Sequence, residues 1–286
     1  MPELPEVQTI VSELNKKIKN KTIKIVVTSA VKSALPSAII LARKLKNKKI
    51  YSIGRRGKMI IIDLGGDHNI LIHLKMTGQL VYASKSGQKI SGGHAIGNVG
   101  ELPNKFSRIV IDFTDGSALY FNDIRKFGWI KYVDNATREL TKQKYGVEPF
   151  DKEYRLSWFL DLLKKYKNKK IKQLLLDQEK IAGIGNIYAD ESLFMAHILP
   201  TRIAGDLKEK EVKDLYLAIP KILKFAITKG GTTSDNYVRT DGTKGGMLKY
   251  LKVYKRAGQK CLRCNNVIKK IKLGGRGTHF CPDCQK

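Results

Sequence analysis

Acidic residues, long apolar stretches and scattered cysteines are what this sequence has little of. No apolar run reaches about 18 residues, so we expect no membrane-spanning helix and no membrane partner. The sequence has only 26 Asp and Glu but 54 Lys and Arg, which gives a formal net charge of +28. Such a charge favours polyanionic partners, with nucleic acid first and anionic membrane second. Individual lysines in runs such as 44–49 and 164–170 are more often solvated than in contact with a partner.

Cysteine is absent from the first 260 residues. The four cysteines have the spacing C-x2-C-x16-C-x2-C, which is typical of a zinc site; they are Cys261, Cys264, Cys281 and Cys284. Disulfides are the alternative, but no secretory signal precedes these residues. The spacing therefore predicts one structural Zn²⁺ held by four thiolates, a closed site with no open position for a substrate.

The first six residues, MPELPE, lead directly into an amphipathic helix pattern that extends to about Asn20. Removal of Met1 would leave Pro2 as a secondary amine, with Glu3 and Glu6 one helical turn apart beside it. An α-amino group has a pKa of about 7.7–8.0, so a useful fraction is unprotonated at neutral pH. Its attack on an electrophilic carbon yields an iminium, which is an electron sink. Proline and glutamate are also ordinary helix-start residues, and that is the alternative interpretation.

Short β-rich runs separated by turns occupy the chain from Thr22 to about Val133. We expect strands at residues 23–27, 50–53, 59–64, 70–73, 79–82, 108–113, 118–121 and 129–132. This pattern predicts an antiparallel sandwich or barrel. Residues 84–106 are rich in Gly, Ser and Lys and are expected to form a long, mobile loop.

Two stretches of this β-rich part carry candidate functional side chains. Residues 54–58, GRRGK, predict a tight basic turn. Lys58 is expected to begin the following strand, where the direction of its side chain is well defined. The alternative is that it is an exposed side chain of the turn without a function. In residues 122–129, Arg125 beside Phe127 suits insertion into a base stack, although Phe127 could equally belong to the core.

Residues 134–149 are polar and without a clear period, which predicts a linker before a helical part. Helices are expected at residues 154–165, 172–179, 187–195 and 209–228. The small residues at 182–188 precede a helix start, where backbone amides can hold a phosphate and Asn186 can add a donor. A Gly- and Thr-rich loop is expected at 230–250. Glycines flank Arg276 at an expected hairpin tip, where the arginine either reaches into a groove or faces solvent.

Several of these motifs occur together, in the same order, in bacterial formamidopyrimidine-DNA glycosylase. They are residues 1–7 (MPELPEV), 57–58 (GK), 73–78 (HLKMTG), 123–128 (DIRKFG), 183–188 (GIGNIY) and the zinc hairpin. The chain resembles this family over essentially its whole length. The resemblance implies an α+β protein of two domains, an N-terminal antiparallel β-sandwich with an N-terminal helix and a C-terminal helix-two-turn-helix domain plus a zinc finger. The implied bounds are 1–134 for the catalytic sandwich, 135–150 for a linker, 151–254 for the helix-two-turn-helix domain and 255–286 for the zinc finger.

The resemblance further implies a bifunctional DNA glycosylase and AP lyase of base excision repair. Such an enzyme excises oxidised purines, chiefly 8-oxoguanine and formamidopyrimidines, and then cuts the abasic site by β,δ-elimination. Pro2 would attack C1′ of the damaged nucleotide and form a Schiff base, with Glu3 as proton donor and Glu6 in a supporting role. Lys58 would assist β-elimination, and Arg276 would assist δ-elimination and contact a phosphate.

The implied partner is damaged double-stranded DNA, bound by a monomer in the bacterial cytoplasm and at the nucleoid. Met76, Arg125 and Phe127 would fill the gap left by the extruded base. Arg125, Lys167 and Asn186 match DNA-contacting positions of the family. A base inside a duplex is out of reach, so the enzyme must turn it out of the stack.

Two features depart from the family pattern. Residues Phe106-Ser107-Arg108 replace a usual His-Asp-His segment, so the DNA contact expected at its first histidine is absent. The sequence leaves open whether Arg108 replaces that contact. The loop at 84–106 is also longer than usual.

Three other functions compete with this prediction. An endonuclease VIII-type enzyme would prefer oxidised pyrimidines, but Met76 and Phe127 favour the purine enzyme. A non-catalytic damaged-DNA-binding protein would have no need of Pro2, Glu3 and Lys58. Only the charge supports the third possibility, a zinc-bearing protein that associates with RNA or with the ribosome.

Overall fold

The computed structural model describes residues 1–93, 101–232 and 246–286. The chain divides into two units and passes between them more than once. The first unit is made of Met1–Gln143 and Lys229–Leu248, and the second of Lys144–Thr228 and Lys249–Lys286. The domain bounds that the resemblance implies remain a prediction. The first unit also contains the segment Lys229–Leu248, which follows α7 (Glu209–Thr228).

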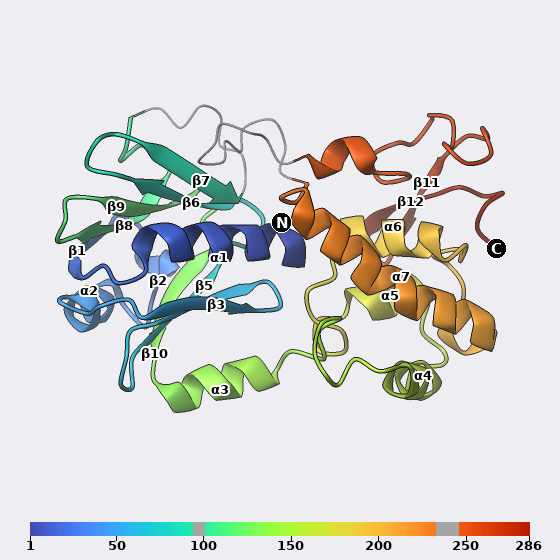
Figure 1. Cartoon of the computed structure of the whole chain (residues 1–286), viewed down its shortest axis with the longest axis horizontal. Coiled ribbons are helices and arrows are strands. Elements are labelled where there is room, and N and C mark those ends of the chain that lie inside the picture. The colour runs from blue at the N-terminus through green and yellow to red at the C-terminus, as the bar shows by residue number, and fades with distance from the viewer. Residues whose placement is uncertain (94–100, 233–245) are drawn as a thin grey trace. The chain divides into compact units, whose positions relative to one another are not determined.

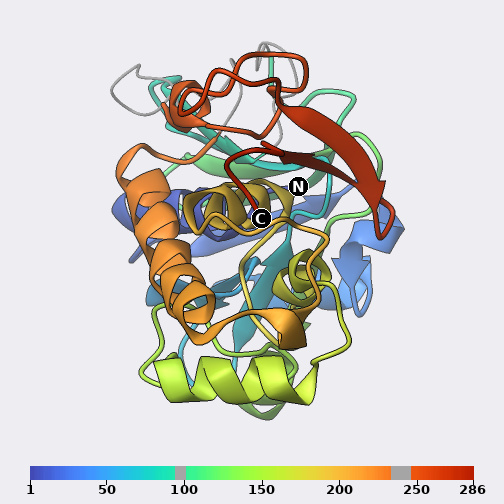
Figure 2. The ribbon, with the colours of Figure 1, turned by 90° about the vertical axis from the view of Figure 1, so that its right-hand side faces the viewer.

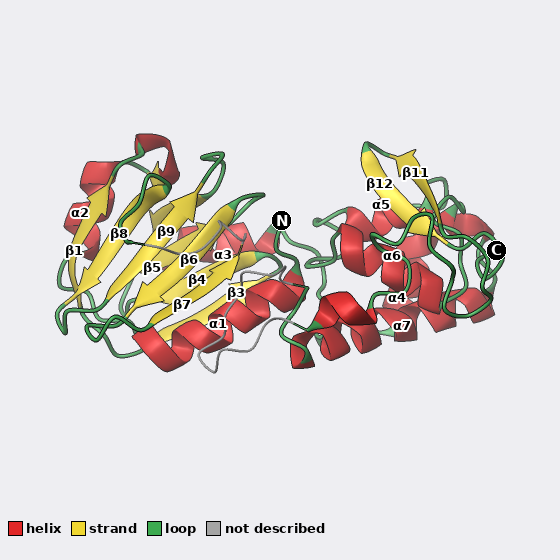
Figure 3. Ribbon diagram, turned by 90° about the horizontal axis from the view of Figure 1, so that it is seen from above, coloured by secondary structure: helices red, strands yellow, loops and turns green. Residues whose placement is uncertain are grey.

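Two five-stranded sheets form the body of the first unit (Figures 1 and 3). The strand order of one sheet is β1 (Ile23–Thr28), β8 (Ser107–Phe113), β9 (Ala118–Asp123), β6 (Gly78–Ala83) and β7 (Lys89–Gly93). The order of the other is β2 (Ala34–Leu35), β10 (Trp129–Val133), β5 (Asn69–His73), β4 (Met59–Asp63) and β3 (Ser52–Arg56). The strands pair antiparallel apart from the short β2, which is parallel to β10. The predicted antiparallel β-sandwich is therefore confirmed.

Helix α1 (Leu4–Ile18) packs into the core of this sandwich. Its buried apolar side chains recur every three or four residues as predicted; they are Val7, Ile10, Val11, Leu14 and Ile18. They share one cluster with side chains of both sheets and of α2 (Ala38–Leu45), among them Leu41 and Phe121. A 3₁₀ turn, η1 (Val31–Ser33), precedes β2. Because α1 is fixed along its length, the direction of the N-terminus is fixed too.

Two segments of the first unit differ from the sequence-based prediction. Strand β7 lies inside the expected loop 84–106, because five residues pair with β6 in a register from Lys89–Ala83 to Gly93–Gln79. A strand this short and rich in glycine has little period of its own, and pairing with a neighbour forms it. Residues 94–100 of that loop lie outside the described part of the chain. Helix α2 was not predicted.

The expected linker at 135–150 begins with a helix, α3 (Asn135–Gln143). No helix was predicted at these residues. Helix α3 buries none of its residues, so it has no apolar stripe from which a helical period could be recognised. Polar contacts hold it instead, since Asn69 Nδ2 donates to Asn135 Oδ1 at 2.9 Å and Arg138 Nη1 donates to Asn69 Oδ1 at 2.8 Å.

The second unit consists of helices and a two-stranded zinc hairpin (Figure 2). Its elements are α4 (Leu156–Lys165), α5 (Ile171–Leu176), α6 (Asn186–Met195), η2 (Ala204–Asp206), α7, β11 (Lys269–Leu273) and β12 (Arg276–Phe280), with η3 (Met247–Tyr250) where the units meet in sequence. Helix α7 has the predicted bounds, and α5 ends earlier than predicted. Helix α6 packs against both α7 and β12, so it connects the helical part with the hairpin.

Most of the expected loop at 230–250 lies outside the described residues. Its described ends meet, because Gly246 N–H donates to Lys229 O at 2.8 Å and Met247 N–H donates to Gly231 O at 3.2 Å. Within the described ranges, every helix is too short or too polar to cross a lipid bilayer.

Candidate functional site

The start of α1 gathers Pro2, Glu3 and Glu6, and all three are buried. Glu3 is only 3% exposed, and its N–H donates to Glu6 Oε2 at 2.9 Å. The two glutamates form a capping box, in which each side chain satisfies a backbone group at the helix start. The helix-start interpretation is thus confirmed. The same contacts hold Glu3 in a defined position next to Pro2, as the chemical interpretation requires.

Glu6 also holds the segment that follows α7. Its Oε1 accepts the Thr232 N–H at 2.8 Å and the Thr232 hydroxyl at 3.0 Å. The backbone of Gly231, at φ +78, passes so close that a Cβ there would lie 2.8 Å from this oxygen. Glu6 therefore accepts hydrogen bonds with both oxygens and joins the start of α1 to the segment after α7.

Lys58 lies in the two-residue turn between β3 and β4, since Arg56 pairs directly with Met59. The prediction that Lys58 begins a strand is wrong by one residue, because Gly57 takes φ +55 and the ladder resumes only at Met59. Lys58 is 4% exposed, so the alternative of an exposed turn decoration is also wrong.

Hydrogen bonds between α1 and β3 set this turn beside the start of the helix. Asn15 Nδ2 donates to Ile53 O at 2.5 Å, and Ile53 N–H donates to Asn15 Oδ1 at 3.2 Å. Closer to the helix start, Arg55 Nε donates to Gln8 Oε1 at 2.8 Å. The strand therefore runs toward the N-terminal end of α1 (Figure 1), and the Lys58 turn follows the end of this strand.

His73 lies on β5, opposite Met59 on one side and Trp129 on the other. Its Nδ1 accepts the Lys75 N–H at 3.0 Å. Burial, followed by the positive charges of Lys75 and Lys58, lowers the pKa of His73 to about 3. The ring is therefore neutral near pH 7 and carries its proton on Nε2. His73 belongs to the motif at residues 73–78, but nothing in the sequence distinguishes its side chain from the rest of that motif.

Asp123, the first residue of the motif at 123–128, organises the predicted insertion residues, a role that the sequence did not indicate. Its carboxylate is fully buried. Oδ1 accepts the Thr77 hydroxyl and the Arg125 N–H, the latter at 3.1 Å, and Oδ2 accepts the Gly128 N–H at 2.7 Å. A Cβ at Gly128 would lie 2.7 Å from Phe121 Cζ, so the turn closes only with glycine there. One carboxylate thus fixes both the β5–β6 and the β9–β10 connections.

These two connections carry the predicted trio of Met76, Arg125 and Phe127. Met76 is 37% exposed and Phe127 is 54% exposed. The Arg125 guanidinium carbon lies 4.6 Å from the centre of the Phe127 ring, which is a cation–π contact. The alternative that Phe127 belongs to the core is wrong. The trio presents apolar and cationic surface on short, anchored turns.

In the second unit, the hairpin tip holds Arg276 at the start of β12. Gly274 and Gly275 form the two-residue turn with φ +55 and +76, which is the backbone that a tight hairpin turn needs. Arg276 is exposed. Asn186, the first residue of α6, donates from Nδ2 to Gly277 O at 2.8 Å. The structure therefore brings Asn186 and the Arg276 hairpin together.

A buried ion pair lies beneath this hairpin, and the sequence did not indicate it. Lys172 and Asp190 are both fully buried, with Nζ and Oδ1 2.6 Å apart. Lys172 Nζ also donates to Thr278 Oγ1 at 2.8 Å, and Asp190 Oδ2 accepts the His279 N–H at 2.9 Å. Helices α5 and α6 thus hold β12 through one charged contact. The lysine-rich sequence around it concealed which lysine is buried.

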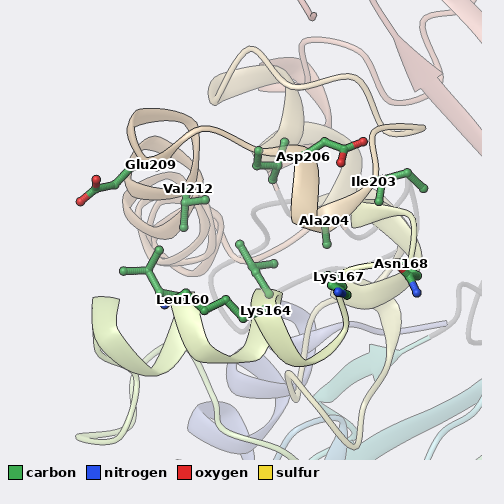
Figure 4. A pocket seen from close by; sticks show the side chains of 12 residues that line it. Leu160, Lys164, Lys167, Asn168, Ile203, Ala204, Asp206, Glu209 and Val212 are labelled. Carbon is green, nitrogen blue, oxygen red and sulfur yellow. The ribbon is translucent and has the colours of Figure 1, made fainter.

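Lys167 lies elsewhere in the second unit, after the end of α4. It lines a cavity of about 660 Å³ together with Asn168, Asp206 and other residues of α4, η2 and α7 (Figure 4). Its carbonyl accepts the Gly205 N–H at 2.9 Å. The predicted contact of Lys167 with DNA stays a prediction.

The four cysteines converge as their spacing predicts. Their Sγ atoms all lie within 4.8 Å of one another. Two of the separations are 3.9 Å, between Cys261 and Cys284, and 3.4 Å, between Cys264 and Cys281. Four thiolates about 2.3 Å from one zinc ion are about 3.8 Å apart in a tetrahedron. The four cysteines therefore fit one Zn²⁺, which would stabilise the hairpin and leave no position open for a substrate.

Comparison with known proteins agrees with this arrangement. The family model described as formamidopyrimidine-DNA glycosylase N-terminal domain matches residues 1–130. The model of the formamidopyrimidine-DNA glycosylase H2TH domain matches residues 145–237, and that of the zinc finger found in FPG and IleRS matches residues 258–286. The fold and the site place this chain in the class of proteins that combine a β-sandwich, a helix-two-turn-helix domain and a zinc finger.

Relatives match over the whole chain. A formamidopyrimidine-DNA glycosylase of Carboxydothermus hydrogenoformans is 39% identical, with 100% of both chains covered. One of Lactobacillus acidophilus is 38% identical and covers 100% of this chain and 99% of its own. The chain belongs to the formamidopyrimidine-DNA glycosylase family.

Solved structures of Lactococcus lactis Fpg are also similar. Its complex with DNA containing an abasic site has a TM-score of 0.88 at 35% identity, with 99% of each chain covered. Its complex with DNA containing Fapy-dG has a TM-score of 0.86 at 35% identity, covering 99% of this chain and 100% of that chain.

The buried ion pair predicts a cost for Lys172→Met. This variant leaves the Asp190 carboxylate buried without its ion-pair partner, so the second unit should lose about 3–5 kcal/mol of stability. Native-state hydrogen exchange of the β11 and β12 amides measures the loss. The matched control is Lys169→Met, which removes an exposed ion pair with Asp177 and should cost less than about 1 kcal/mol. Equal exchange in both variants would contradict a positioning role for Lys172.

The pKa of His73 predicts how stability depends on pH. In the folded chain this pKa is about 3, below the unfolded value of about 6.5. Between these two pH values His73 binds a proton in the unfolded chain but not in the folded chain. The stability due to neutral His73 is therefore complete above about pH 6.5 and is lost as the pH falls toward 3. His73→Asn keeps an acceptor near Nδ1 and should lose about 2 kcal/mol less than wild type between pH 7 and pH 5 in urea unfolding. An identical loss in both proteins would show that His73 titrates normally.

Proposed function

We propose that this protein is a DNA glycosylase and AP lyase of base excision repair that excises oxidised purines, 8-oxoguanine and formamidopyrimidines, from duplex DNA. The observation that carries the proposal is the similarity over the whole chain to formamidopyrimidine-DNA glycosylases, one of which is seen with abasic-site DNA and with Fapy-dG DNA. The first unit supports it, because Pro2 and Glu3 are buried at the start of α1 and Lys58 is buried in the turn that follows β3, a strand that is hydrogen-bonded to α1.

Pro2 is the proposed nucleophile. While Met1 precedes it, the Pro2 nitrogen is an amide and cannot attack, so Met1 must be removed. The freed amine then forms a bond to C1′ as the bond from C1′ to the damaged base breaks. Opening of the sugar, with a proton from Glu3, converts the adduct to an iminium. The capping contact with Glu6 holds Glu3 beside Pro2 throughout.

The iminium prepares the two eliminations that cut the strand. It acidifies the C2′ proton, and loss of that proton expels the 3′ phosphate. A second elimination expels the 5′ phosphate, and water then releases Pro2. Lys58 would assist the first elimination and Arg276 the second, with Arg276 also in contact with a phosphate. Two cations suit these steps because each leaving group is anionic.

The remaining residues are proposed to hold the damaged duplex. Met76, Arg125 and Phe127 would enter the gap left by the extruded base, at an unstacking cost of a few kcal/mol that their contacts offset. Asn186 and Lys167 would contact the backbone. Zinc has no step in the chemistry and would hold the hairpin. We expect a monomer that works on the DNA of the bacterial cytoplasm and nucleoid.

Schiff-base trapping tests the nucleophile. Wild-type protein, incubated with an 8-oxoguanine duplex and borohydride, should form a covalent adduct, and Pro2→Gly should reduce its yield by at least about tenfold, because the secondary amine is lost. Pro5→Ala is the matched control, since it removes the other proline of the helix start and should leave the yield unchanged.

Intact-protein mass spectrometry of the same samples reports whether Met1 is absent, and under native conditions whether one zinc is bound. Wild-type protein that lacks Met1, binds the duplex and yet gives no adduct would favour the non-catalytic DNA-binding alternative.

Lesion preference separates the purine enzyme from the endonuclease VIII-type alternative. Duplexes with 8-oxoguanine opposite cytosine should be cut faster than matched duplexes with thymine glycol, because Met76 and Phe127 favour the purine enzyme. Single-turnover rates at saturating protein measure the chemical step for both. Faster cutting of thymine glycol would overturn the purine assignment but not the nucleophile.

A further inference from the structure

Another pair of a cation and an aromatic ring lies in the segment that leads into β8. Lys105 is exposed and Phe106 is half-buried. The Lys105 ammonium lies 5.3 Å from the centre of the Phe106 ring. This repeats the chemistry of the Arg125–Phe127 pair, in which a cation covers the face of an exposed ring.

The backbone of Asp123 anchors this pair. Its N–H donates to Phe106 O at 2.9 Å, and its carbonyl accepts Arg108 Nε at 2.7 Å. Arg108 Nη1 also donates to Lys105 O at 3.1 Å. The Arg108 guanidinium thus ties the Lys105 backbone to the end of β9. The segment is further held where Ser107 Oγ donates to Asn122 Oδ1 at 2.8 Å.

Asp123 therefore joins both cation–aromatic pairs. Its side chain holds the turn of Arg125, and its backbone holds the segment of Lys105 and Phe106. A ligand that reaches the first pair meets a second cation on an anchored backbone beside it. Duplex DNA suits such an arrangement, because it offers phosphates at regular intervals along each strand.

We propose that Lys105, seated on the Phe106 ring, binds a backbone phosphate of the DNA, and that Arg108 is the positioning residue of this contact. The proposal rests on the proposed function, since it requires a DNA substrate. The ring restricts the ammonium, so little side-chain freedom is lost on binding. Arg108 donates its Nε and one Nη within the chain, and these bonds give it the role of holding the Lys105 backbone.

The test is the binding of full-length protein to a duplex with a tetrahydrofuran abasic analogue, which has no base to excise. Lys105→Ala should weaken binding about three- to tenfold at low salt and lower the slope of log Kd against log salt by about 0.9, the value for one phosphate contact. Lys105→Arg keeps the charge and should keep the slope. The matched control is Lys24→Ala, an exposed lysine of β1 near the other end of β8.

Arg108→Gln tests the positioning role. It should weaken binding and reduce the slope as Lys105→Ala does, and the double variant should be no weaker than Lys105→Ala alone, because both changes remove one contact. Additive losses would instead show that Arg108 binds DNA by itself, and would overturn the positioning role. A loss of affinity in Lys105→Ala with an unchanged slope would overturn the phosphate contact.

The trapping assay distinguishes failure of this inference from failure of the proposed function. Wild-type protein and the control Lys24→Ala should both form the Pro2 adduct at saturating protein, because Lys24 has no part in DNA binding or in the chemistry. Wild-type affinity and slope in Lys105→Ala, with normal trapping by wild-type protein, would overturn the inference alone. Wild-type protein that neither binds nor forms the adduct would overturn both.

Discussion

The need to satisfy buried carboxylates is the constraint on which the structure depends. A carboxylate removed from water is costly unless hydrogen-bond donors surround it. Among the acids of the described residues, Glu6, Asp123, Asp190 and Glu191 meet this condition with donors from distant parts of their own unit. Glu6 joins α1 to Thr232, and Asp123 joins two strand connections. Asp190 joins Lys172 to β12, and Glu191 accepts the backbone N–H groups of residues 252–254. In a chain with so few acids, these contacts place the functional segments.

The buried acids hold turns on which exposed cations and apolar side chains stand. Arg125, Phe127 and Met76 stand on turns that Asp123 anchors, and Arg276 stands on a hairpin that the Lys172–Asp190 pair supports. An exposed arginine on a loose loop would lose much conformational entropy on binding. A short turn with a fixed backbone loses less. The charge of +28 provides general attraction to polyanions, whereas the anchored turns provide direction.

The sequence predicted most of the elements that have a strong period or a special residue. The apolar stripe of α1, the bounds of α7 and the cysteine spacing were confirmed, because each depends on neighbours in sequence. Strand β7 and helix α3 were missed, since pairing with β6 forms the first and polar contacts with Asn69 hold the second. Lys58 was placed one residue too far into its strand, because the left-handed Gly57 extends the turn.

By itself, the sequence determined the sandwich, the zinc ligands and the family, since periodicity, ligand spacing and ordered motifs are all read along the chain. Only the tertiary structure decided which charges are buried. Asp123, Asp190, Lys172 and His73 resemble their solvated counterparts in sequence, and Lys105 resembles any other lysine of a basic chain. Burial and partners separate them, and both arise from residues far apart in sequence that the fold brings within hydrogen-bond distance.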